Sequence, residues 1–305
     1  MSRAHGKVIL IGEHAVVYNK PAIALPLVSA TVHTTLTPHD IMLIDSPLYS
    51  GEMHEAPQML SPITELVSAL KSYFQSGPYT ITIHSTIPLR AGFGSSAAIA
   101  ASIIRAFYED HGATLSNHAL YQWLHMSETK AHGTPSGIDA YAVTNDHPFE
   151  FIKDDPPTPL HLPAKGHLVI THSGEQGQTK KAVQMVREKL ENNEGKANID
   201  AIEAATQAAK AAIKRGDLHA LGRALNEAHA CLDDLSLCTK EVNVRVDAAR
   251  EAGALGAKMS GGGLGGAVIA LAEDEQIAGK IVNVFKQWTD DVFTLNFKED
   301  FYAKR

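Results

Sequence analysis

The sequence predicts a globular protein of two domains that combine strands with helices. Its 305 residues are 44% hydrophobic and 20% charged, which supplies enough apolar material for a core. Strand-like patterns dominate the start of the chain, and Ala-rich helical runs dominate the later part. A proline-rich stretch at residues 156–163 can continue neither kind of element. We therefore expect one domain at residues 1–164 and a second at residues 165–305.

The first expected elements are strands. Residues 7–11 form an apolar, largely β-branched run, as in a strand buried on both faces, and residues 12–14 then turn out of it. Two further strands are expected at residues 22–27 and 30–36, with Pro26 and Pro38 near their ends as strand-breaking residues. The start of the chain is therefore expected to form a sheet.

The next segment mixes a loop with regular elements. Residues 45–62 are rich in Pro, Gly and Ser without a steady period, which predicts a surface loop or a lid. Apolar residues at helical spacing predict a helix over 63–74, and alternation predicts a strand over 79–87. A glycine-rich turn at 92–96 then leads into a helix over 97–108.

The remaining expected elements are mostly helical. A helix at 115–130 is followed by a turn-rich segment at 132–137. Beyond the proline-rich stretch, strands are expected at 167–171 and 267–271, and helices at 179–191, 199–214, 218–232 and 240–251. A short run at 257–259 lies between the last of these helices and the second strand. Gly253 is a plausible residue to end the last of these helices, and a second glycine loop occupies residues 260–266.

Composition excludes several classes of function. Lys and Arg number 27 against 34 Asp and Glu, a net charge of −7 that is the opposite of a nucleic-acid-binding footprint. No run reaches the ~18 apolar residues that a membrane span needs. The two cysteines, Cys231 and Cys238, are too few for a disulfide framework or a Cys-based metal site, and they favour a reducing cytoplasm. The 16 histidines are dispersed without a metal-binding pattern.

The glycine turn at residues 92–96 is the first candidate site. Glycines let backbone amides approach phosphate oxygens, and the helix that follows presents unpaired N–H groups and the positive end of its dipole. Ser95 and Ser96 add hydroxyls. The segment is neither a Walker motif nor a dinucleotide fingerprint, and a plain tight turn before a helix is the alternative.

Four further side chains could carry chemistry. Asp139 could take a proton from a hydroxyl, and Glu128 could hold Mg²⁺ beside phosphates. Lys7 could pair with a catalytic acid and stabilise developing negative charge, while His14 follows the same strand. Solvated surface acids, a strand-edge lysine and a hydrogen-bonded core histidine are the alternatives.

Four segments, taken together, resemble the superfamily of galactokinase, homoserine kinase, mevalonate kinase and phosphomevalonate kinase (GHMP kinases). The first family motif, in its mevalonate kinase form, is resembled by residues 6–18. Their sequence is Gly-Lys-Val-Ile-Leu-Ile-Gly-Glu-His-Ala-Val-Val-Tyr. Residues 88–98 resemble the second motif, the ATP phosphate loop, and residues 258–267 resemble the third, a glycine loop near the nucleotide site. Residues 132–139 resemble the segment that presents the catalytic aspartate.

The resemblance implies a two-domain α+β fold, with an N-terminal sheet-and-helix domain, a ferredoxin-like C-terminal domain and an active site in the cleft between them. It implies phosphorylation of the 5-hydroxyl of mevalonate by ATP and Mg²⁺, for isoprenoid synthesis. The alternatives are another small-molecule kinase, such as phosphomevalonate kinase, or a non-catalytic ligand sensor. A homodimer is left open.

The resemblance also implies a role for individual residues. Asp139 would accept the hydroxyl proton, with Lys7 beside it to keep it ionised and to steady the alkoxide. Ser96 and Glu128 match the magnesium ligands. The mevalonate pocket would include Lys7 and Asp139 together with His14, Ser136 and Thr179. The ATP-binding residues would be Pro88, Arg90, Ala91, Gly92, Phe93, Gly94, Ser95, Ser96 and Ala97.

Three positions depart from the family pattern. Asn19 stands where many relatives have glycine, and Asn tolerates left-handed backbone. Phe93 replaces the usual leucine, and Leu264 interrupts the glycine run of the third motif. The last two bear on the shape of the nucleotide pocket and on nucleotide preference.

Overall fold

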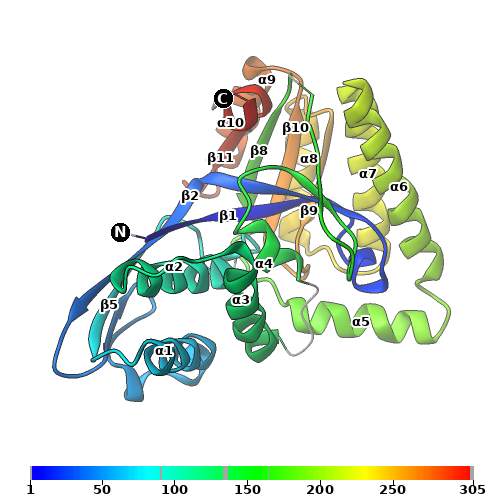
Figure 1. The fold of residues 1–305 in the computed structure, drawn as a ribbon. Coiled ribbons are helices and arrows are strands. Elements are labelled where there is room, and N and C mark those ends of the chain that lie inside the picture. Colours follow the sequence, from blue (N-terminus) through cyan, green and yellow to red (C-terminus); the bar gives the residue numbers. More distant parts are fainter. Residues whose placement is uncertain (1, 90, 133–136, 164, 303–305) are drawn as a thin grey trace. The chain divides into compact units, whose positions relative to one another are not determined.

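The computed structural model describes residues 2–89, 91–132, 137–163 and 165–302, which form two compact units (Figure 1). The first unit contains residues up to 6, 30–88 and 94–145; the second contains residues 7–29, 89–93 and the chain from 146 onward. Each unit is therefore discontinuous in sequence. The domain boundary expected at residue 164 falls on a residue outside the described ones and stays a prediction.

The first unit combines strands with α-helices. Its strands are the start of β1 (Ser2–Ile11), the end of β2 (Ala22–Pro38), β3 (Leu43–Ser46), β4 (Tyr49–Glu52) and β5 (Tyr79–Ser85). β5 pairs antiparallel with residues 32–38 of β2 and parallel with β3, and β3 pairs antiparallel with β4. Its helices are α1 (Ser61–Phe74), α2 (Ser95–Asp110), α3 (Asn117–His132) and α4 (Ile138–Ala142). The helices α1, α2 and α3 pack against one another.

The segment expected as a loop or lid at residues 45–62 is instead ordered, so that expectation was wrong. It contains the β3–β4 hairpin, the short 3₁₀ helices η2 (Met53–Glu55) and η3 (Gln58–Leu60), and the start of α1. In the hairpin turn the Ser46 hydroxyl accepts hydrogen bonds from the amides of Leu48 and Tyr49. Strands of four residues are too short to show a period, because a turn interrupts the pattern before it repeats.

The two strands expected at 22–27 and 30–36 are one strand, β2, which contains Pro26. Residues 22–24 pair with β6 (Phe149–Phe151), and residues 32–38 pair with β5. Pro26 falls between the stretches that pair with β6 and β5, and β2 also pairs with β1. A proline interrupts a strand by removing a backbone donor, and it is tolerated where that donor is not needed for pairing.

The second unit contains a four-stranded antiparallel sheet in the order β11-β8-β10-β9. These strands are β8 (His167–His172), β9 (Gly256–Ser260), β10 (Ala267–Ala272) and β11 (Phe293–Asn296). Helices separate β8 from β9 and β10 from β11, so the chain follows the β-α-β-β-α-β order of a ferredoxin-like unit, as the resemblance implied.

The helices of the second unit match most of the expected positions. They are α5 (Thr179–Glu191), α6 (Lys196–Arg215), α7 (Leu218–Asp234), α8 (Lys240–Glu251), α9 (Glu275–Phe285) and α10 (Phe297–Tyr302), with the 3₁₀ helix η1 (Ala15–Tyr18) near the start of the chain. The side chains of Asp217, Thr239 and Asp274 each accept a hydrogen bond from the amide three residues on and so cap α7, α8 and α9. Gly253 follows α8 with φ +102°, as expected of a glycine that ends a helix.

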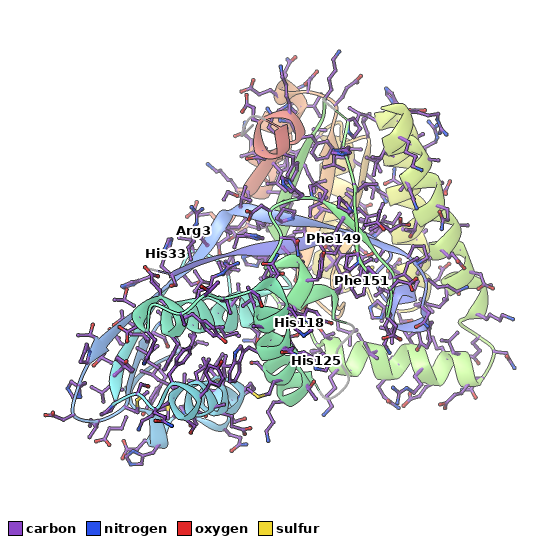
Figure 2. All side chains as sticks on the ribbon, viewed as in Figure 1. Arg3, His33, His118, His125, Phe149 and Phe151 are labelled. Atoms are coloured by element: carbon purple, nitrogen blue, oxygen red, sulfur yellow. The ribbon has the colours of Figure 1, made fainter. Side chains whose placement is uncertain are left out.

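The second unit also holds the first part of β2. Phe149 and Phe151 of β6 (Figure 2) are buried and pair with Ala24 and Ala22 of β2, and β6 pairs in turn with β7 (Thr158–Pro159). Every helix within the described ranges is too short or too polar to cross a bilayer.

Candidate active site

Within the glycine turn at residues 92–96, the chain leaves the second unit and enters the first. Ala91, Gly92 and Phe93 belong to the second unit, and Gly94 begins the next stretch of the first. Gly94 has φ +71° and is the N-cap of α2, so the amides of Ser95, Ser96 and Ala97 form the first turn of this helix. First-turn amides lack acceptors within the helix and attract anions. The predicted strand, glycine turn and helix start are therefore present.

Three helices of the first unit carry the predicted acids and the second serine. Ser96 is half-buried in the first turn of α2, Glu128 is 4% exposed on α3, and Asp139 is half-buried in the first turn of α4. Because α3 contacts both α2 and α4, the fold gathers the helices that bear these groups. Two other predicted site residues, Arg90 and Ser136, lie outside the described residues.

Lys7 and the residues before Gly94 are built into the second unit, while Pro88 follows β5 in the first. Lys7 is 3% exposed, and its amide donates a hydrogen bond to the Phe93 carbonyl at 2.9 Å. The Phe93 ring is fully buried and packs edge-to-face against Phe293, with ring centroids 5.8 Å apart. Gly92 has φ +85°, and an added Cβ would lie 3.2 Å from the Ala267 amide nitrogen. The side chain at position 93 is therefore a core residue of this unit.

His14 and Thr179, which are 165 positions apart in sequence, meet at Gly262. The His14 ring nitrogen Nε2 lies 3.0 Å from the Gly262 carbonyl oxygen, and an added Cβ on Gly262 would lie 2.0 Å from Thr179 Oγ1. Thr179 is the first residue of α5. The structure therefore brings together two residues that the sequence placed in one substrate pocket.

The His14 ring is a neutral hydrogen-bonding group at pH 7. Burial lowers the pKa of His14 to about 4; the Gly262 carbonyl opposes this shift, and the positive charge of Lys258 adds to it. Because a carbonyl only accepts, Nε2 carries the proton and Nδ1 is the acceptor nitrogen of the ring.

The third motif packs against the first motif within the second unit. The Ser260 hydroxyl accepts from the Ile9 amide at 3.0 Å and donates to the Ile9 carbonyl at 2.8 Å. The Lys258 ammonium donates to the Glu13 carboxylate, and both side chains are almost fully buried. This ion pair was not predicted from the sequence. Its signal was Lys258 itself, a single charged residue in the apolar strand β9, which needs a buried partner.

Histidines occur on a strand and on a helix of the first unit. Figure 2 shows His33 on β2 and His118 and His125 on α3. Within the described part of the chain, no group of three or more His, Cys, Asp or Glu side chains could hold a metal ion.

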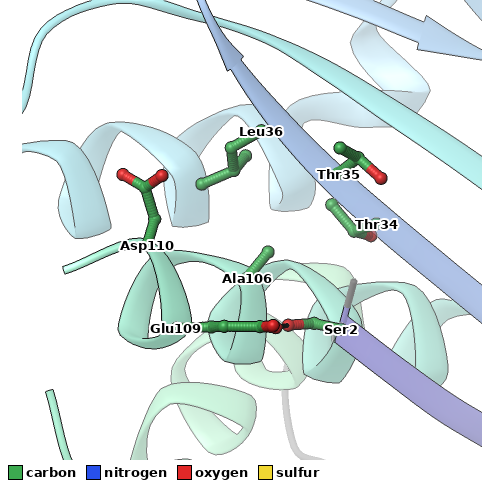
Figure 3. Close-up of a pocket in the computed structure, with 7 residues that line it drawn as sticks. All are labelled: Ser2, Thr34, Thr35, Leu36, Ala106, Glu109 and Asp110. Atoms are coloured by element: carbon green, nitrogen blue, oxygen red, sulfur yellow. Dashed lines mark hydrogen bonds between the residues drawn. The ribbon is translucent and has the colours of Figure 1, made fainter. Parts of the chain in front are cut away.

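A pocket of about 160 Å³ lies elsewhere in the first unit (Figure 3). It is lined by Ser2, by residues 34–36 of β2, and by Ala106, Glu109 and Asp110 of α2. The Ser2 hydroxyl donates to Glu109 at 2.5 Å, and the Tyr79 hydroxyl donates to Asp110 at 2.7 Å. None of the predicted site residues lines this pocket.

Comparison with known proteins identifies the family. Residues 61–146 match the family described as GHMP kinases N terminal domain, and residues 209–290 match GHMP kinases C terminal. The mevalonate kinase of Aeropyrum pernix is 30% identical over 97% of this chain and 95% of its own length. The chain belongs to the mevalonate kinase family of the GHMP kinases. The mevalonate kinase of Pyrococcus horikoshii, 32% identical over 90% of this chain and 89% of its own, agrees.

The fold of this mevalonate kinase family member matches solved structures. The L. major mevalonate kinase in complex with R-mevalonate superposes with a TM-score of 0.83, at 25% identity, over 97% of this chain and 95% of that one. The α+β fold and the kinase activity implied by the sequence resemblance are thereby confirmed, and family membership implies ATP-dependent chemistry.

Proposed function

We propose that this kinase transfers the terminal phosphoryl group of ATP to the 5-hydroxyl of mevalonate, in isoprenoid synthesis. The observation that carries the proposal is the meeting of His14 and Thr179 at Gly262, where the first and third family motifs pack together. The L. major enzyme, which was solved with R-mevalonate, supports the choice of substrate.

The proposed mevalonate site uses hydrogen bonds from neutral groups as well as charge. The Nδ1 atom of neutral His14 can accept a hydrogen bond from a substrate hydroxyl, and the Thr179 hydroxyl can donate or accept. Lys7 supplies a positive charge, and Ser136 completes the proposed set.

The proposed ATP site rests on the start of α2. The first-turn amides at Ser95, Ser96 and Ala97 carry the positive end of a 16-residue helix dipole, which suits phosphate oxygens. Pro88, Arg90, Ala91, Gly92, Phe93 and Gly94 belong to the same proposed site. Because Phe93 is buried in the core, its departure from the usual leucine is expected to change packing more than phosphate contacts.

Ser96 and Glu128 fit Mg²⁺ as ligands. Their hydroxyl and carboxylate oxygens are the hard donors that Mg²⁺ prefers, and Mg²⁺ typically needs only one or two carboxylates beside substrate phosphates. Glu128 is 4% exposed, and a cation stabilises a buried carboxylate. When bound, Mg²⁺ neutralises charge on the phosphates.

The proposed chemistry is an in-line transfer. Asp139 accepts the proton of the 5-hydroxyl as its oxygen forms the new bond to phosphorus and the bond to the ADP oxygen breaks. The Lys7 ammonium opposes the negative charge that develops on the attacking oxygen. Positioning and charge neutralisation supply most of the rate enhancement in such transfers.

The cytoplasm is the proposed compartment. Cys231 and Cys238 are both free thiols in the structure, and burial raises the pKa of Cys238 to about 12. Unpaired cysteines are typical of a reducing environment.

Release of ADP by the purified protein with Mg²⁺ and ATP tests the proposal. The assay compares mevalonate, phosphomevalonate, homoserine and galactose as acceptors. Release with mevalonate alone is the expected result. Release with phosphomevalonate or another acceptor, or with none from folded protein that binds ATP, would contradict the proposed substrate.

A further inference from the structure

The backbone at His14 adopts a conformation that L-residues rarely occupy. His14 has φ +61° and ψ −46°, and the Ala15 amide donates to the Glu13 carbonyl at 2.7 Å. This hydrogen bond, two residues apart, closes a γ-turn of the positive-φ type, which is rare and strained. Such strain persists only where the surrounding structure holds it in place.

The contacts that hold this turn come from β9 and the glycine loop that follows. On one side, the Glu13 carboxylate pairs with Lys258, whose ammonium also donates to the Met259 carbonyl at 2.5 Å. On the other side, the His14 ring donates to the Gly262 carbonyl. Glu13 and His14 are therefore held by two different residues of the segment 258–262.

We propose that the buried Glu13–Lys258 ion pair is a clamp that holds the His14 γ-turn in its strained conformation, so that Glu13 and Lys258 are positioning residues for the substrate. The part that concerns substrate rests on the proposed function. A buried ion pair is not needed for stability as such, because apolar residues of similar volume often stabilise a core equally well. The hydrogen bond between the two charged side chains does, however, fix the orientation of the two backbone segments that carry them.

The surroundings keep the clamp electrically balanced. Burial lowers the pKa of His229 to about 4, so this neighbour of the Met259 amide is neutral at pH 7. Burial also lowers the pKa of Lys258, and the Glu13 carboxylate opposes that shift. The Cys238 thiol, 3.7 Å from His229 Nδ1, stays protonated because its pKa is raised to about 12. His229 and Cys238 therefore add no charge of their own beside the Glu13–Lys258 pair.

The test is the double variant Glu13→Gln/Lys258→Met, which removes both charges together. Removing one partner alone would leave an unpaired buried charge and endanger folding. The matched control is Glu150→Gln/Lys210→Met, another ion pair of the second unit, with a 2.5 Å separation. It joins β6 to α6, and the printed hydrogen bond of Lys210 goes to Glu150 rather than to Glu13, His14 or Gly262.

The rate of amide hydrogen exchange over residues 12–18 measures the stability of the turn in the absence of substrate. We expect the amides of Ala15 and Val17 to exchange about tenfold faster or more in the clamp variant, which corresponds to about 1.4 kcal/mol of lost protection. The control variant should keep wild-type exchange in this segment. Unchanged exchange in a folded clamp variant would overturn the proposal.

Steady-state kinetics measure the effect of the clamp on the KM for mevalonate. We expect the KM for mevalonate to rise about tenfold in the clamp variant and the KM for ATP to change by less than about twofold. In a His14→Ala background the clamp substitutions should add little to the KM for mevalonate, because coupled residues are not additive. A full additional rise in that background would show that the pair does not act through His14.

Glu13→Asp serves if the double variant does not fold. It keeps both charges but shortens the side chain by one methylene. Amide exchange at Ala15 and Val17 should again be faster and the KM for mevalonate higher, each by less than in the double variant. Wild-type behaviour of Glu13→Asp would overturn the clamp. If the wild-type protein phosphorylates none of the acceptors, the proposed function fails, whereas the exchange measurement still decides whether the clamp exists.

Discussion

The candidate groups of the two units are held in different ways. In the first unit, Ser96, Glu128 and Asp139 are side chains on three regular helices, whose backbone is set by helical hydrogen bonds. In the second unit, His14 lies on a strained turn that is tied to a glycine loop by side-chain contacts. A substitution in the first unit should therefore change chemistry with little change of structure. A substitution in the second should change geometry and stability together.

Asp139→Asn should give the largest effect on turnover and almost none on stability. The loss of a general base lowers turnover by about 10²- to 10⁴-fold. Asparagine is nearly isosteric, and position 139 is only half-buried in the first turn of α4, so the melting temperature and ATP affinity should stay near wild type. Kinetics, thermal unfolding and ATP titration measure these three quantities. Asp40→Asn, at an exposed position of the same unit, is the control. Near-normal turnover in Asp139→Asn would remove Asp139 from the mechanism.

Acid should weaken the second unit through His14 and His229. Both have a pKa lowered to about 4 by burial, so between pH 6.5 and 4 the unfolded chain binds more protons than the folded one. The free energy of unfolding therefore falls as pH falls, by about 2 kcal/mol per histidine between pH 7 and pH 5. Urea unfolding at the two pH values measures the loss.

His229→Asn isolates one of these contributions. It keeps a polar acceptor near the Met259 amide but cannot titrate, so its loss between pH 7 and pH 5 should be smaller than wild type by about 2 kcal/mol. His118→Asn, at an exposed position on α3, should keep the wild-type loss. An equal loss in all three proteins would show that His229 binds protons equally in both states.

Gly262→Ala should destabilise the second unit through contact alone. The φ of Gly262 is ordinary, but the new Cβ would lie 2.0 Å from Thr179 Oγ1, and overpacking of this kind costs about 1–3 kcal/mol. Thr179→Gly in the same chain should restore part of the loss, since it removes the opposing atoms. Gly279→Ala is the control, because it lies in α9 with nothing within 4 Å of the added methyl and should stabilise the helix. A melting temperature of Gly262→Ala equal to wild type would contradict the close contact.

The sequence predicted most of the regular elements, because hydrophobic period and glycine turns are local signals. The helix at α8 and the strand at β10 lie where the pattern placed them, and Asn19 adopts the left-handed backbone that asparagine tolerates. The hairpin at β3 and β4 was missed because its strands are only four residues long. The unbroken β2 was missed because Pro26 looked like a terminus, whereas it falls between the stretches that pair with β6 and β5.

The site was predicted as a set of residues but not as an arrangement. The family resemblance implied that His14 and Thr179 share one pocket; that pocket and the roles assigned to Lys7, Glu128 and Asp139 stay predictions. The Glu13–Lys258 pair joins residues 245 positions apart, and no local pattern specifies which buried charge meets which. The strain at His14 could not be predicted either, since it depends on contacts from the other end of the chain.

Leu264 should show the smallest effect and the most diagnostic one. It stands in the glycine loop at φ +55°, and its side chain packs partly buried against the core of the second unit. Leu264→Ala loses packing and keeps the left-handed strain of about 1 kcal/mol, whereas Leu264→Gly loses the same packing without that strain. The glycine variant should therefore be the more stable of the two, by up to about 1 kcal/mol in urea unfolding. Leu190 packs against the same core from within α5, where glycine should be about 1 kcal/mol worse than alanine. Opposite signs at the two positions would establish that backbone conformation, rather than packing, distinguishes the glycine loop from the helices; the same sign at both would contradict the left-handed backbone at Leu264.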